Sequence, residues 1–263
     1  EMKYSICKVI AESAREIPQN ITVQKVSEVE VYIPHIVEVT ENLHEFLSDD
    51  DLITPFLRLG YFYKGQGLYL QAQPWYKTGK EMAEQRFGEE HSDVAISLSD
   101  LALLYHSQGR YEEAEPLCIQ ALDMKKKLFG EEHSDVAISL NNLALLYENQ
   151  GRYKEAEPIY IQALDMSKKL FGEEHPSVDI SLNNLAALYK SQGRYEEAET
   201  LFIQALEMSK KLFGEEHSDV AISLGNLALL YNYQGRYEEA EPLYIQALEM
   251  SKKLFGEEHP SVA

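Results

Sequence analysis

The sequence predicts an all-α fold, a solenoid of antiparallel helix hairpins, from a repeated loop motif, a repeated turn motif and the helical apolar spacing between them. Leu-Phe-Gly-Glu-Glu-His recurs every 42 residues, from a variant first copy around Gly88 to a last copy around Gly256. Gly-Arg-Tyr recurs in the same register from Gly109 to Gly235. A fixed period of this size is typical of stacked supersecondary units.

The first helix of each repeat is predicted from its apolar residues. The stretch from Asp135 to Gln150 carries them at helical spacing, so that they share one stripe. The residues of this stripe are Val136, Leu140, Leu143, Ala144 and Tyr147. Gly151 follows and breaks the helix.

A second helix is predicted from Tyr153 to Phe171, because Gly172 can end it. Acidic residues near its start and lysines near its end both oppose the helix dipole. Pro158 lies inside this helix and removes a backbone hydrogen bond, so we expect it to shape the hairpin. The two helices must pack antiparallel.

Residues 1–50 lie outside the period and are predicted to form a helical cap or linker. One amphipathic helix is expected from Met2 to Arg15 and another from Pro34 to Leu47. Residues 51–263 are expected to form an array of about five hairpins, the last followed by the start of another at His259. We interpret the chain as a piece of a longer protein.

The spacing Leu140-x2-Leu143-Ala144-x2-Tyr147 resembles the tetratricopeptide signature. The 42-residue period, with Asn-Asn-Leu-Ala-Leu-Leu-Tyr and Gly-Glu-Glu-His-Pro, resembles the variety found in kinesin light chains. This resemblance covers about residues 51–263 and implies a right-handed superhelical array that binds proteins or peptides.

The segment from Ile33 to Tyr69 also resembles the stretch that precedes the repeats in bacterial NB-ARC signalling NTPases of the STAND class. That resemblance implies a nucleotide-binding part upstream, with this chain as the C-terminal sensor.

Composition limits the partners. The chain has 24 Lys and Arg against 44 Asp and Glu, a formal charge of -20, which argues against nucleic acid and anionic membranes. Cys7 and Cys118 belong to no Cys-x-x-Cys pair, so neither a disulfide framework nor a zinc site is indicated. Cys118 takes the place of an aromatic residue in other copies, so we interpret it as a packing residue. The chain shows no signal peptide and no long apolar run, so we expect a cytoplasmic location.

No motif indicates an enzyme. One histidine follows Glu-Glu in each repeat, at His91, His133, His175, His217 and His259. Histidines one repeat apart should be on the order of 10 Å or more from each other, too far to share a metal ion, so we interpret them as loop or helix-start residues. We expect no catalytic residue, metal or cofactor in this fragment.

The first helices carry a second stripe, opposite the core stripe, that the tetratricopeptide resemblance places on the concave surface. Asn142, Asn184 and Asn226 stand in it between aliphatic residues, and such amides suit an extended peptide because they both donate and accept hydrogen bonds. They resemble asparagines in kinesin light chains. Alternatively, the amides bond each other where neighbouring helices crowd.

The second stripe differs between copies in charge and in side chain. Asp100 is expected to make one rung acidic, and the first copy is expected to be basic. Residues 106, 107, 148, 149, 190, 191, 232 and 233 vary between copies, and we hypothesise that they tune ligand choice. The predicted binding residues are Arg58, Tyr61, Lys64, Ile96, Asp100, Leu103, His106, Ser107, Ile138, Asn141, Asn142, Leu145, Glu148, Asn149, Ile180, Asn183, Asn184, Ala187, Lys190, Ser191, Ile222, Asn226, Leu229, Asn232 and Tyr233.

The sequence therefore predicts a protein-protein interaction module that binds a peptide or protein, as the sensor part of a larger signalling NTPase. One alternative is a free-standing adaptor of the kinesin-light-chain kind. Another is a structural scaffold that self-associates through the open ends of the solenoid.

Overall fold

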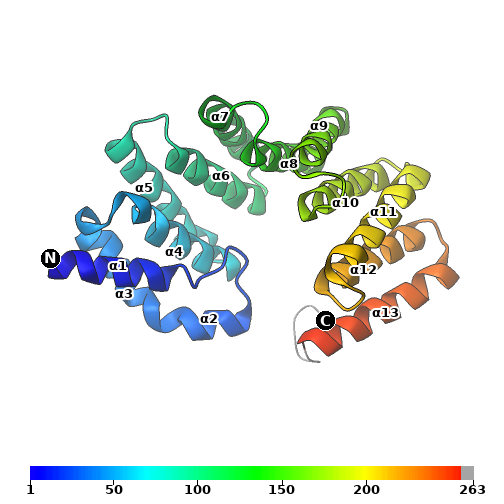
Figure 1. Cartoon of the computed structure of the whole chain (residues 1–263), viewed down its shortest axis with the longest axis horizontal. Coiled ribbons are helices and arrows are strands. Elements are labelled where there is room, and N and C mark those ends of the chain that lie inside the picture. The colour runs from blue at the N-terminus through cyan, green and yellow to red at the C-terminus, as the bar shows by residue number, and fades with distance from the viewer. Residues whose placement is uncertain (256–263) are drawn as a thin grey trace. The chain divides into compact units, whose positions relative to one another are not determined.

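The computed structural model describes residues 1–255, which form helices joined by short turns and contain no β-strand (Figure 1). The chain divides into two compact units, unit 1 (Glu1–Glu131) and unit 2 (Glu132–Ala263). The predicted all-α class is confirmed. The predicted start of a further repeat at His259 lies outside the described residues.

Each repeat is a hairpin of a shorter A helix and a longer B helix, seen as successive antiparallel pairs in Figure 1. Unit 1 contains α4 (Thr54–Gly65) with α5 (Tyr69–Phe87) and α6 (Ser92–Ser107) with α7 (Tyr111–Phe129). Unit 2 contains α8 (Ser134–Asn149) with α9 (Tyr153–Phe171), α10 (Pro176–Ser191) with α11 (Tyr195–Phe213) and α12 (Ser218–Tyr233) with α13 (Tyr237–Phe255). Within each unit, the A helix of one hairpin packs on the B helix of the hairpin before it.

The hairpin turns explain the Gly-Arg-Tyr motif. Gly193 takes a φ of 76°, a left-handed conformation that ends α10 without the strain a side chain would add. The next residue, Arg194, places its guanidinium 3.9 Å from the centre of the Tyr189 ring and pairs with Glu157 at 2.7 Å. The arginine therefore links the turn to the B helix of the preceding hairpin.

The Gly-Glu-Glu-His loops join one hairpin to the next and begin each A helix. His175 is the N-cap of α10, and its Nδ1 accepts the Ser177 backbone N–H at 3.1 Å. Its ring stacks on Phe171, with centroids 4.2 Å apart. His91, His133 and His217 cap α6, α8 and α12 in the same way. The interpretation of these four as helix-start residues is confirmed, and His259 lies outside the described residues.

The core of unit 2 forms between consecutive hairpins. Phe202 of α11 is buried against Leu230 and Tyr231 of α12 and against Ala186 of α10. Burying an aromatic ring of this size contributes much of the apolar stabilisation of a junction. In unit 1, Cys118 takes the position that Phe202 takes here and is buried, as the sequence predicted for a packing residue.

The N-terminal residues differ from the sequence expectation. The structure places α1 at Met2–Ala14, α2 at Val23–Val29 and α3 at Ile33–Glu38. The short helical segment η1 (Glu30–Tyr32) lies between α2 and α3, and η2 (Val39–Leu43), η3 (His44–Phe46) and η4 (Asp49–Asp51) follow α3. The helix expected from Pro34 to Leu47 is present from Ile33 to Phe46, but it is not α-helical throughout. It becomes a π-helix at Val39, where the buried Thr40 hydroxyl donates to the Val37 carbonyl at 2.8 Å, and a 3-10 helix at His44. Helices α1 and α3 pack on α4.

In the part of the chain that the structure describes, no helix is both long and apolar enough to cross a membrane.

Candidate functional site

The candidate site is the outward row of the A helices, which we call the A-helix stripe. In α8 it consists of Ile138, Asn142, Leu145 and Asn149, and residues 42 apart take the same place on the other A helices. The stripe is described separately for each unit. Most of its predicted members are exposed or half-buried, and two are buried.

In unit 2 the stripe presents an isoleucine at the same place on each A helix. The exposed fractions are 55% for Ile138, 57% for Ile180 and 59% for Ile222. Aliphatic side chains this exposed lose contact with water when a ligand covers them, which favours binding. Leu229 and Tyr233 of α12 are also exposed. Unit 2 therefore offers a row of apolar contacts at regular intervals.

The asparagines of the stripe bond each other across hairpins. The Asn184 side-chain amide donates to Asn141 Oδ1 at 3.3 Å, and that of Asn226 donates to Asn183 Oδ1 at 3.3 Å. This is the arrangement that the sequence left open as an alternative to ligand binding. Among the described residues no donor reaches Oδ1 of Asn184 or Asn226, so each amide keeps an acceptor for a peptide N–H.

The variable ends of the A helices also make contacts between hairpins in unit 2. Glu148 accepts from the Tyr160 hydroxyl at 3.1 Å and from Ser191 Oγ at 3.2 Å, and burial raises the pKa of its carboxyl. Lys190 Nζ lies 5.5 Å from the centre of the Tyr233 ring. These side chains are therefore held in place before any ligand arrives, although Ser191 and Tyr233 stay exposed.

In unit 1 two predicted stripe residues are buried, and the expectation of an exposed acidic rung was wrong. Asp100 is 5% exposed, because the Tyr61 hydroxyl donates to its Oδ2 at 2.7 Å and the Gln19 amide donates to its Oδ1 at 3.2 Å. Burial raises the pKa of both Asp100 and Tyr61. The hydrogen bond from Tyr61 and the nearby charges of Lys64 and Lys125 lower the pKa of Asp100 and so oppose the effect of burial.

The basic residues expected at the start of the stripe are engaged within unit 1. The Arg58 guanidinium donates to the Ile17 carbonyl at 2.5 Å. Burial lowers the pKa of Lys64, and the charge of Asp100 opposes this. His106 is half-buried, and burial together with Lys64 lowers the pKa of its ring. An anionic ligand would therefore have to displace contacts that the chain itself makes.

The stripe of unit 1 borders a hollow of about 490 Å³ between α4 and α6. Thr54, Arg58, Tyr61 and Ile96 of the stripe line it, together with carboxylates of Asp49, Asp50 and Asp93. Burial raises the pKa of Asp93, and the Asp50 charge adds to this effect. The hollow therefore joins apolar and acidic surface.

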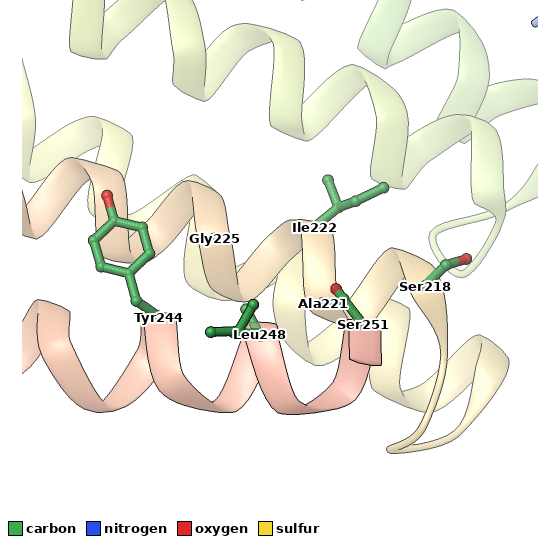
Figure 2. A pocket seen from close by; sticks show the side chains of 8 residues that line it. Ser218, Ala221, Ile222, Gly225, Tyr244, Leu248 and Ser251 are labelled. Carbon is green, nitrogen blue, oxygen red and sulfur yellow. The ribbon is translucent and has the colours of Figure 1, made fainter. Parts of the chain in front are cut away.

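A second hollow, of about 350 Å³, lies between α12 and α13 in unit 2 (Figure 2). Tyr244 and Leu248 of α13 project toward α12, where Gly225 replaces the asparagine of α8 and α10. Tyr244 is 37% exposed, whereas Phe202 at the same place in α11 is 2% exposed beneath α12. The sequence reasoning missed this hollow, although Gly225 is a visible departure from the repeat.

The sequence reasoning also missed Ile17 and Gln19, which contact the unit 1 stripe from the link between α1 and α2. That link lies outside the period, so no repeat pattern indicated it. The remaining predicted residues are half-buried or exposed in the structure: Arg58, Lys64, Ile96, Leu103, His106, Ser107, Ile138, Asn141, Asn142, Leu145, Glu148, Asn149, Ile180, Asn183, Asn184, Ala187, Lys190, Ser191, Ile222, Asn226, Leu229, Asn232 and Tyr233.

Comparison with known proteins agrees with this architecture. The family model for the tetratricopeptide repeat matches residues 51–127, 93–169, 135–211, 177–253 and 219–263. No curated protein matches the sequence.

Solved structures share the fold over most of the chain. BtubC (BKLC) from P. vanneervenii is 24% identical, covers 97% of this chain and 94% of its own, and has a TM-score of 0.67. A putative kinesin light chain from P. anserina with nearly identical TPR-like repeats is 27% identical over 76% of this chain and 94% of its own, with a TM-score of 0.64. NprR in complex with its cognate peptide NprX is 17% identical over 96% of this chain and 68% of its own, with a TM-score of 0.68.

Proposed function

This chain belongs to the tetratricopeptide repeat family, and we propose that its A-helix stripe binds a polypeptide ligand in an extended conformation. The observation that carries the proposal is the row of isoleucines in unit 2, each more than half exposed at the same place on successive A helices. These isoleucines are more exposed than the isoleucines repeated on the B helices, which are 37 to 49% exposed, so a ligand that covers them removes more apolar surface from water.

The spacing and chemistry of the row suit an extended chain. Packed helices lie about 10 Å apart, which is about one three-residue turn of a peptide in the extended polyproline II conformation, so side chains three residues apart lie on one face. Ligand side chains at this interval would contact Ile180 and Ile222. The free acceptors of Asn184 and Asn226 would take peptide N–H groups beside them. Backbone hydrogen bonds would supply affinity, and the aliphatic contacts would supply a preference for apolar residues.

Charge favours a neutral or basic ligand. The chain carries a formal charge of -20, which repels acidic polypeptides and nucleic acid at long range. NprR and the Rap protein are structural neighbours that were solved with a peptide or with Competence and Sporulation Factor. Their common fold supports a peptide as the ligand class here.

A peptide library displayed on phage is the direct test, because it samples many candidate sequences against the A-helix stripe at once. We expect the native chain to enrich ten-residue peptides with aliphatic residues at intervals of about three. The variant Ile180→Asp with Ile222→Asp should bind the enriched peptides at least tenfold more weakly, since each carboxylate would be desolvated under the ligand.

The matched control uses the same substitution on exposed isoleucines of the B helices. Ile161→Asp with Ile203→Asp should bind the enriched peptides like the native chain, and both variants should keep native helical circular dichroism. Equal loss in both variants, or no loss in either, would show that the ligand binds elsewhere.

We propose further that the array is the cytoplasmic sensor of a larger bacterial signalling NTPase. The support is the resemblance of the segment from Ile33 to Tyr69 to the region before the repeats in NB-ARC proteins. An NTPase region upstream in the same reading frame is expected. A heptad-repeat region there would instead support a free-standing adaptor.

Self-association is a second candidate, favoured by the exposed Tyr244 and Leu248 of the α12–α13 hollow. Sedimentation velocity between 5 and 200 µM, chosen to span about 1.5 decades of concentration, tests it against a Leu248→Lys variant. A mass that rises with concentration only in the native chain would support this candidate.

A further inference from the structure

The chain's own link between α1 and α2 lies on the stripe of unit 1. Arg58, Gly65 and Asp100 are stripe residues of α4 and α6, and each contacts this link. The Arg58 guanidinium binds the Ile17 carbonyl, and the Gln19 side-chain amide donates to Asp100 Oδ1 at 3.2 Å. The stripe thus contacts both the backbone and a side chain of a non-helical segment.

Two aliphatic side chains anchor the same segment. Ile17 is fully buried. Ile21 lies against Gly65, where a Cβ atom would come within 2.2 Å of Ile21 Cγ2. Later A helices carry Ser107, Asn149, Ser191 and Tyr233 at the Gly65 position. Gly65 is the last residue of α4, and the absence of a side chain there leaves room for the close approach of Ile21.

The segment is a non-helical stretch of chain with bends at Ile17, Gln19 and Asn20. No helix lies between Ala14 and Val23, and Pro18 at the centre of the link cannot continue one. Its contacts come from every second residue. Ile17 is a buried aliphatic residue whose carbonyl is hydrogen-bonded, Gln19 donates from its side-chain amide, and Ile21 is a second aliphatic residue. Arg58 and Asp100 supply a donor for the carbonyl and an acceptor for the amide.

We infer that the unit 1 stripe is a binding site for a non-helical peptide with the pattern aliphatic-x-Gln-x-aliphatic, and that the segment Ile17–Ile21 fills this site as an internal copy of the ligand. The inference rests on the proposed function, which treats the A-helix stripe as a peptide site, and adds the chemistry of the ligand. A glutamate in place of the glutamine would face the carboxylate of Asp100 without a hydrogen to donate, so the site discriminates against it.

The test uses the full chain and a fluorescent synthetic peptide of residues 15–22 as the probe. In the native chain the tethered segment competes with the probe at an effective concentration on the order of 1 mM. The variant Ile17→Ser with Gln19→Glu releases the segment but keeps Arg58, Gly65 and Asp100. Fluorescence anisotropy should show the probe binding this variant at least tenfold more tightly than the native chain.

Three controls sharpen the test. A probe carrying Gln19→Glu should bind the released variant at least tenfold more weakly than the native probe. A chain with Asn20→Glu gains the same charge beside the contact and should bind the probe no better than the native chain. The single variant Gln19→Glu, which retains the Ile17 anchor, should show a smaller gain of about threefold and serves if the double variant loses helicity.

Failure of this inference is separable from failure of the proposed function. Adding Asn184→Ala and Asn226→Ala to the released variant changes only unit 2 and should leave probe binding unchanged. Equal probe binding by the native and released chains, or equal binding of the glutamine and glutamate probes, would overturn the inference whatever unit 2 binds.

Discussion

Unit 1 and unit 2 each bury an aspartate between hairpins but compensate it differently. Asp100 in unit 1 accepts hydrogen bonds from Tyr61 and Gln19 and has two lysines nearby. Asp179 in unit 2 accepts hydrogen bonds from Ser209 Oγ at 3.1 Å and from the Asn183 side-chain amide at 3.4 Å, and the charge that acts on it is the carboxylate of Asp219. Burial raises the pKa of Asp179 to about 6, and Asp219 adds to this effect. The two aspartates stand at different positions of the repeat, and the neighbours of each decide how far the effect of burial on its carboxyl is offset.

Positions that the two units share in the repeat also carry different residues. Phe202 in unit 2 fills the place of Cys118 in unit 1, and Ala186 fills the place of Gly60. In unit 1 a larger neighbour takes the space, because a Cβ atom on Gly60 would come within 2.3 Å of the Tyr76 ring. The two units therefore fill their cores with different combinations of large and small side chains.

The largest expected effect compares these aromatic and cysteine positions. Phe202→Ala should destabilise unit 2 by about 3 to 5 kcal/mol, because the cavity left under α12 cannot close. Cys118→Ala at the same place in unit 1 should cost about 1 kcal/mol, roughly the value of one buried methylene-sized group. Urea unfolding followed by circular dichroism, with amide exchange to locate the loss, measures both. Similar losses would show that the units are packed alike.

The second prediction concerns the pH dependence of Asp179. Its pKa is about 6 in the folded chain and 3.8 in an unperturbed aspartate, so between these two pH values the folded state binds more protons than the unfolded state. The contribution of Asp179 to the free energy of unfolding is therefore complete below about pH 3.8. It decreases as the pH rises through about 6, by a total of about 2 to 3 kcal/mol. Asp179→Ala, which restores the alanine found in α8 and α12, should remove this slope from the urea midpoints measured between pH 4.5 and 7.5. A slope that persists would assign it to another group.

The third prediction tests the glycine of unit 1. Gly60→Ala should destabilise the chain by about 1 to 3 kcal/mol, since the new methyl group overlaps the buried Tyr76 ring. Gly225→Ala in unit 2 is the matched control, because its Cβ atom would meet nothing within 4 Å. That variant should gain up to about 1 kcal/mol from helix propensity. Opposite signs in thermal unfolding sustain the comparison, and equal signs would refute it.

The smallest expected effect is that of breaking one of the exposed Lys–Glu ion pairs that recur in both units. Lys211 pairs with Glu174 in unit 2, as Lys127 pairs with Glu90 in unit 1 at 2.9 Å. Lys211→Ala should cost less than about 1 kcal/mol, because exposed ion pairs are screened and lose side-chain entropy. The loss should disappear in 1 M salt, where the screening length is about 3 Å. A large, salt-independent loss would mean that the lysine packs rather than pairs.

The sequence predicted most of the fold wherever the period holds. Helix α9 begins and ends where expected, at Tyr153 and Phe171, and α8 is shifted by one residue. Glycines that accept a left-handed turn and histidines that cap the next helix mark these ends in each copy. In residues 1–50 no copy serves as a comparison, and a local side-chain contact such as that of Thr40 with the Val37 carbonyl accompanies the change in helix geometry.

The site was predictable only in part, for a related reason. Ile138, Ile180 and Ile222 could be placed on one outward row from helical spacing alone. The burial of Asp100 depends on Tyr61 and Gln19, which lie 39 and 81 residues away in the sequence. Tyr61 stands where later copies carry leucine or alanine, and Gln19 lies outside the period, so the other copies carry no information about these contacts.

Successive hairpins of unit 2 make the same contacts with each other, and this has a genetic consequence. The asparagine bonds always join residues 43 apart, and the Lys169–Glu132 and Lys211–Glu174 pairs always join residues 37 apart. Removing or duplicating one whole period therefore rejoins helices that already fit each other. Nearly identical neighbouring copies are also the substrates on which unequal recombination acts. A lineage carrying this gene can thus lengthen or shorten the array by one hairpin at a time, and the length of ligand that it spans changes while the fold does not.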